Sequence, residues 1–109
     1  MAAHITVDDN YVYWTNCSND GQVMKIPREG GTPIVLAENQ TYPTSVKVNG
    51  THAYWATRDG DVKRIPLAGG TPTILVSGEV FPFGVAIDAN HVYWTNYADP
   101  GMVKKLRLN

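Results

Sequence analysis

The sequence feature that most constrains the fold is an internal repeat of about forty residues. A Tyr-Trp pair occurs at 13–14, 54–55 and 93–94, at intervals of 41 and 39 residues. Self-similarity at such a period is typical of repeat architectures, in which each copy is one supersecondary unit that buries its apolar faces against its neighbours. The chain is therefore expected to fold as successive copies of one unit.

The match between the copies extends well beyond the Tyr-Trp pair. The third copy stops before its Gly-Gly turn, so the predicted units span about 4–43, 44–83 and 84–109, the last of them incomplete. The further matching positions are Gly30 to Pro33 with Gly69 to Pro72, and Lys25-Ile26-Pro27 with Arg64-Ile65-Pro66 and Lys105-Leu106-Arg107.

Each complete copy is predicted to form four short β-strands. Runs rich in Val, Ile, Thr, Tyr and Trp alternate with clusters of Gly, Asn and Asp, and no apolar pattern of helical period is sustained. A repeated four-stranded antiparallel unit of this length is a β-propeller blade, so the predicted fold class is all-β, a partial propeller. The predicted strands are 4–8, 11–16, 22–27, 33–37, 45–49, 52–57, 61–66, 72–76, 84–88, 91–96 and 102–107.

Composition excludes some functions. The net charge is -1 and the Lys and Arg residues are scattered, which argues against nucleic-acid binding. No run approaches the roughly 18 apolar residues of a membrane helix, and the first residues lack signal-peptide features, so localisation stays unknown. Cys17 is the single cysteine, which excludes an intramolecular disulfide and a thiolate metal cluster.

The Tyr-Trp-Thr-Asn segments at 13–16 and 93–96 resemble the tetrapeptide of YWTD-type β-propellers, and more loosely NHL-type propellers. The YWTD-type domains are six-bladed and occur in relatives of the low-density lipoprotein receptor. Asn16 and Asn96 stand where that motif has Asp, and the second copy reads Tyr-Trp-Ala-Thr at 54–57. The resemblance covers almost the whole chain and implies a fragment of about three blades.

The resemblance also implies a role for the aromatic pair of each copy. In such folds these rings pack between neighbouring blades, and large rings bury roughly 150–250 Å² each. A carbohydrate-stacking Trp is the alternative interpretation. The residues expected at the inter-blade seams are Tyr13, Trp14, Tyr54, Trp55, Tyr93 and Trp94.

Blade number predicts self-association. Closed propellers typically need four to eight blades, because each blade buries both faces, and this chain encodes under three. Its two outermost faces would expose a large apolar patch, so we expect head-to-tail association into a homodimer of six blades. The third strand of the last copy, Met102 to Leu108, would be an unpaired rim edge. An engineered or excised piece of a longer propeller is the other origin that the incomplete unit fits.

Two sets of residues are candidates for a site. Asp8, Asn49 and Asp88 end the first strand of each unit, where Asp and Asn favour turn capping; the alternative is a polar ring at the channel mouth that could hold a cation. Arg58, Phe83 and Tyr97 are candidate contacts for a protein or small-molecule ligand on the loops of one face.

Catalysis is not expected. Ser18, Ser45 and Ser77 lie in no nucleophile motif, and no His–carboxylate pair recurs near them. The sequence therefore predicts a non-enzymatic repeat scaffold or binding module without a cofactor or metal. The alternative from another class is a fragment of a propeller lyase or hydrolase whose catalytic residues lie in blades absent from this chain.

Overall fold

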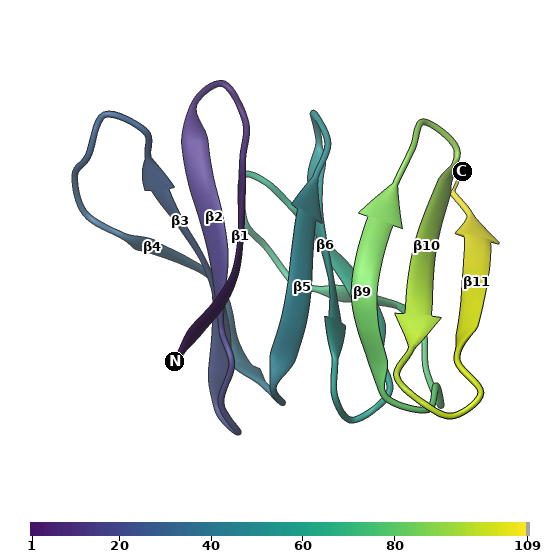
Figure 1. Cartoon of the computed structure of the whole chain (residues 1–109). Coiled ribbons are helices and arrows are strands. Elements are labelled where there is room, and N and C mark those ends of the chain that lie inside the picture. The colour runs from purple at the N-terminus through teal and green to yellow at the C-terminus, as the bar shows by residue number, and fades with distance from the viewer. Residues whose placement is uncertain (109) are drawn as a thin grey trace.

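The computed structural model describes residues 1–108, which form eleven β-strands in three antiparallel sheets and no helix. The sheets stand side by side in chain order, with the first at the left of Figure 1 and the third at the right. No helix in residues 1–108 could span a membrane, since that part of the chain contains none.

The first two sheets have four strands each, hydrogen-bonded in chain order, and the third has three, in the order β11-β10-β9. The first sheet contains β1 (Ala2–Val7), β2 (Tyr11–Asn16), β3 (Gly21–Pro27) and β4 (Ile34–Gln40). The second contains β5 (Pro43–Val48), β6 (His52–Thr57), β7 (Val62–Pro66) and β8 (Thr73–Val76). The third contains β9 (Pro82–Ile87), β10 (His91–Asn96) and β11 (Met102–Arg107).

All eleven strands lie within three residues of the predicted bounds, and the predicted fold class is confirmed. The first strand of each sheet begins two residues earlier than expected. Pro43 and Pro82 are the first residues of β5 and β9, a position where a missing N–H donor does little harm.

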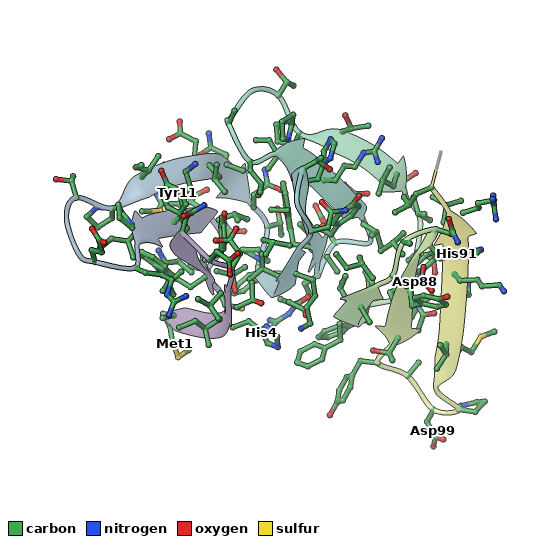
Figure 2. The ribbon with its side chains drawn as sticks, turned by 90° about the horizontal axis from the view of Figure 1, so that it is seen from above. Met1, His4, Tyr11, Asp88, His91 and Asp99 are labelled. Atoms are coloured by element: carbon green, nitrogen blue, oxygen red, sulfur yellow. The ribbon has the colours of Figure 1, made fainter. Side chains whose placement is uncertain are left out.

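The first strands of the three sheets are neighbours. β1 lies beside β5, and β5 lies beside β9, although some forty residues separate each pair along the chain. Seen from above in Figure 2, the sheets fan out around one side of the molecule, where His4 lies. This arrangement places β1, β5 and β9 at the inside of the fan and β4 and β8 toward the rim.

Packing between sheets forms two apolar clusters. The first joins Tyr13 of the first sheet to Val46 and Trp55 of the second, and the second joins Tyr54 to Trp94 of the third. The middle sheet is therefore buried on both faces, and five of the six residues of β6 are buried. The outer sheets bury one face only, so β2 and β10 retain more of the alternation typical of a half-buried strand.

Candidate functional site

The turn after β1 is closed by the carboxylate of Asp8. Its Oδ1 accepts hydrogen bonds from the backbone N–H groups of Asn10 (2.9 Å) and Tyr11 (2.8 Å). Its Oδ2 accepts a hydrogen bond of 2.7 Å from the hydroxyl of Tyr13. Asp residues form such local turns readily, which explains why β1 ends one residue before Asp8 rather than at it.

The same arrangement occurs in the other two sheets. Asn49 Oδ1 accepts from the backbone N–H groups of Thr51 and His52, and its Nδ2 lies 3.3 Å from the hydroxyl of Tyr54. Asp88 Oδ1 caps the third turn, and its Oδ2 accepts a hydrogen bond of 2.6 Å from Tyr93. The three candidates for a channel mouth thus all cap turns.

These contacts change the pKa values of both partners. Burial acts to raise the pKa of Asp8, but hydrogen bonds from Tyr13 and the turn backbone, together with the charge of Lys25, lower it overall. The hydrogen bond from Tyr93, followed by those from the turn backbone, lowers the pKa of Asp88 to about 2. Burial and the bond to Asp8 raise the pKa of Tyr13. Each carboxyl is therefore held ionised and each phenol neutral.

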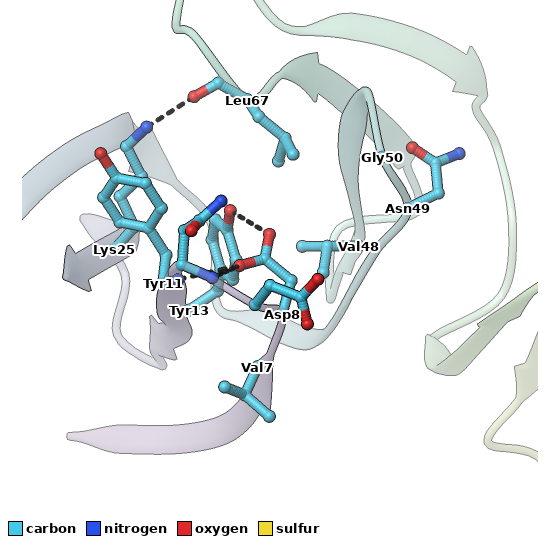
Figure 3. A pocket seen from close by; sticks show the side chains of 11 residues that line it. Val7, Asp8, Tyr11, Tyr13, Lys25, Val48, Asn49, Gly50 and Leu67 are labelled. Atoms are coloured by element: carbon cyan, nitrogen blue, oxygen red, sulfur yellow. Dashed lines mark hydrogen bonds between the residues drawn. The ribbon is translucent and has the colours of Figure 1, made fainter. Parts of the chain in front are cut away.

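A recess of about 410 Å³ opens between the first two sheets at this end, and Asp8 and Asn49 line it (Figure 3). Lys25 also lines it. The Lys25 Nζ donates a hydrogen bond of 2.7 Å to the carbonyl of Leu67 and lies 4.4 Å from the centre of the Tyr11 ring. Asp88 lies on the third sheet and does not line this recess. The polar groups that line the recess are hydrogen-bonded mainly to other groups of the two sheets, which is consistent with a structural contact between the sheets.

The loops at the opposite end bring together the three face-loop candidates. The guanidinium of Arg58 lies 4.4 Å from the centre of the Tyr42 ring and 5.2 Å from that of Phe81. Phe81 lies 5.4 Å from Tyr97 and 6.3 Å from Phe83, and the latter two rings are 5.7 Å apart. We call these five residues, Tyr42, Arg58, Phe81, Phe83 and Tyr97, the Arg58 cluster.

The sequence did not indicate Tyr42 as a candidate. It also did not predict that Phe81 contacts both Arg58, in the loop after β6, and Tyr97, in the loop after β10. Both residues have positive φ, 45° for Tyr42 and 46° for Phe81. For a bulky L-residue this backbone conformation is a genuine outlier that costs about 1–2 kcal/mol. The one available signal was their spacing of 39 residues, each directly before a proline.

The Tyr and the Trp of each pair point to opposite faces of their sheet. Tyr13 faces the second sheet, Trp55 faces the first, Tyr54 faces the third and Trp94 faces the second. Trp14 and Tyr93 lie on the two outward faces, where no neighbouring sheet covers them within residues 1–108. Four of the six predicted seam residues therefore meet another sheet of this chain, and two do not.

A polar joint that the sequence did not reveal accompanies each seam. Gln40 Oε1 accepts hydrogen bonds from Trp55 Nε1 (3.2 Å) and Lys63 Nζ (2.9 Å). Glu79, 39 residues later, accepts one of 2.9 Å from Trp94 Nε1 and pairs with Lys104 Nζ at 3.1 Å. Gln40 and Glu79 thus each link their own sheet to the indole of the next sheet. The spacing of 39 residues between Gln40 and Glu79 indicates that the two positions are equivalent. The sequence alone did not reveal this equivalence because the residue types differ.

Residues 1–108 bring together no group of three or more His, Cys, Asp or Glu side chains in a geometry that could hold a metal ion. Cys17 is a partly buried free thiol.

No protein-family model and no curated protein sequence matches the chain. Among solved structures, it is similar to the computationally designed protein Ika4, with a TM-score of 0.76 and 16% identity over 99% of this chain and 66% of that one. It is also similar to BamB from Moraxella catarrhalis, with a TM-score of 0.63 and 18% identity over 97% of this chain and 43% of BamB. The chain spans less than two thirds of either neighbour. Both are β-propellers, so the three sheets are blades of a partial β-propeller.

Proposed function

We propose that this chain is a non-enzymatic propeller scaffold and binding module of the six-bladed YWTD type, which closes its ring with a second copy of itself. One observation carries the proposal. The face of the first sheet that carries Trp14 is directed outward, whereas the equivalent face of the second sheet, which carries Trp55, is buried against the first sheet.

The outward face of the first sheet is apolar. Ile5 pairs with Trp14, and Trp14 pairs with Met24, so the three side chains share this face. Ile5 is 68% exposed. The equivalent residues of the second sheet, Val46 and Trp55, are fully buried in the first seam. An apolar face of this kind costs free energy in water unless another surface covers it.

The outward face of the third sheet offers the complementary half of a seam. Tyr93 lies on this face, and its equivalent in the second sheet, Tyr54, is buried against the third sheet. Beside Tyr93 is a hollow of about 290 Å³, lined in part by Gly84 and Ala86, whose small side chains leave room for a large ring. In the proposed dimer, Trp14 of each copy enters this hollow of the other, as Trp55 and Trp94 enter their own seams.

Head-to-tail contacts of this kind close a ring only when the rotation per blade adds up to a full turn. Two chains of three blades supply six blades, which lies within the range of known closed propellers. No catalytic role is proposed for Asp8 or Asp88, since their carboxylates are engaged by backbone and phenol donors.

The test is the mass of the purified chain by size-exclusion chromatography with multi-angle light scattering over a wide concentration range. We expect the mass of two chains, with no larger species at higher concentration. A folded, monodisperse single chain with native near-ultraviolet circular dichroism would contradict ring closure, and so would an open series of growing oligomers.

A further inference from the structure

We infer that the Arg58 cluster is a docking site for a partner protein, and that it binds a segment bearing a carboxylate next to an aromatic residue. The inference rests on the proposed role as a binding module.

The blade fold does not require this cluster. The backbone N–H of Arg58 donates to the carbonyl of Tyr42 (3.2 Å), and that of Tyr97 donates to Phe81 (2.9 Å). In the first sheet the equivalent bond joins Cys17 to Met1 at 2.6 Å. The same corner therefore forms with Cys and Met in these places, and neither an Arg nor an aromatic ring is needed to build it.

Two aromatic residues of the cluster have an unfavourable backbone conformation, and the two others are exposed. Tyr42 and Phe81 occupy a left-handed conformation that Gly or Asn would adopt with less strain. Phe83 is 48% exposed and Tyr97 is 70% exposed, so much of the aromatic surface is in contact with water. Tyr, Phe and Arg are the side chains enriched in the buried centres of protein interfaces.

Charge defines the missing partner group. Arg58 forms no ion pair and no side-chain hydrogen bond within residues 1–108, and its guanidinium carbon lies over the rings of Tyr42 and Phe81. The neighbouring carboxylate of Asp59 accepts instead from the hydroxyl of Thr57. A guanidinium in this setting presents a planar fork of N–H donors, which matches a carboxylate in bidentate geometry.

The shape of the site favours a protein over a small molecule. Drug-sized ligands bind in concave pockets that bury 70–90% of their surface. Here the recess of about 420 Å³ beside Tyr97 is lined by Tyr97, Ala98 and Asp99 and not by the other four residues of the cluster, while Phe83 and Tyr97 are largely exposed. A nucleic acid would need several cations along its backbone, and the cluster contains one, in a chain whose net charge is -1.

The experiment uses the full chain against an array of immobilised hexapeptides. One fixed position is Glu, Gln or Lys, and the adjacent positions vary over Pro, Phe, Tyr, Leu and Ala. We expect binding to concentrate on Glu peptides with an adjacent aromatic residue, and the best of them to bind in solution at least tenfold more tightly than its Gln counterpart. A fluorescein-labelled oligo-dT forms a second arm and should not bind.

Three variants complete the test. Arg58→Gln should remove the preference for Glu over Gln, and Tyr97→Ala should weaken binding at least fivefold. Cys17→Ala, at the equivalent position in the first sheet, should bind as the unchanged chain does. Equal binding of Glu and Gln peptides, retention of the preference in Arg58→Gln, oligo-dT binding or no peptide binding each overturns the inference. Light scattering on the same samples reports ring closure separately.

Discussion

The hydroxyl of Tyr13 donates a hydrogen bond of 2.7 Å to the carboxylate of Asp8, five residues earlier and across the first turn. The carboxylate closes the turn with its other oxygen, while the Tyr13 ring is buried in the seam with the second sheet. One pair of residues thus links turn geometry to packing between sheets. Tyr93 and Asp88 repeat the bond in the third sheet.

Tyr13→Phe should lower the free energy of unfolding by about 1 kcal/mol, because it removes a hydrogen bond to a charged group that is partly screened by water. Urea denaturation followed by Trp fluorescence measures the change. Tyr93→Phe is the matched control: it removes the same bond where both partners are more exposed, so its effect should be smaller. An equal or larger loss in Tyr93→Phe would argue against burial as the source of the difference.

Stability should fall as the pH drops from about 4 to about 2. The pKa of Asp88 is lowered from 3.8 to about 2 in the folded chain, so the unfolded chain binds a proton first as the pH falls. The stabilisation is complete above the unfolded pKa and is lost as the pH approaches the folded one. Urea midpoints measured across this range test the prediction.

Asp88→Asn supplies the control for that experiment, because Asn49 already occupies the equivalent position in the second sheet and caps its turn. The variant should fold, and its stability should depend less on pH between about 4 and about 2. An unchanged pH dependence would assign the acid sensitivity to other carboxyl groups, such as Glu79, whose pKa the hydrogen bond from Trp94 lowers most.

Ile5→Glu should convert the proposed dimer into a folded monomer, because it places a charge beside Trp14 on the outward face of the first sheet. Ile74→Glu is the matched control. Ile74 is 55% exposed on the rim strand β8 of the middle sheet, away from both outward faces, and its replacement should leave the mass unchanged. Light scattering with circular dichroism checks both variants, and a dimer that persists in Ile5→Glu would exclude this face from the contact.

Gln40→Ala should destabilise the chain by about 1–3 kcal/mol, because it leaves the buried indole N–H of Trp55 without its acceptor and leaves the Lys63 ammonium with Asp61 alone, at 3.8 Å. Gln40→Glu introduces the residue that the chain itself has at Glu79, and it should retain most of the stability. Urea denaturation distinguishes the two. If Gln40→Glu were as unstable as Gln40→Ala, the joint would depend on the amide group and not on its acceptor oxygen.

The sequence by itself determined the repeat, the strands and the turn residues. Strand formation depends on alternation and on β-branched and aromatic residues within a few positions, and turns depend on Gly, Asn and Asp. All of these are local properties, so eleven strands could be located to within three residues. Asp8, Asn49 and Asp88 were expected to cap turns for the same reason, and their hydrogen bonds do so.

Only the tertiary structure decided which side chains meet between sheets. Adjacent strand residues point to opposite faces, so Tyr13 and Trp14 were equivalent candidates until the stacking of the sheets buried one and left the other outward. The Arg58 cluster likewise depends on four loops that lie far apart in the sequence, and on a positive φ at Tyr42 and Phe81 that their residue types disfavour. Contacts at such separations arise from how whole sheets stack, which local sequence preference does not encode.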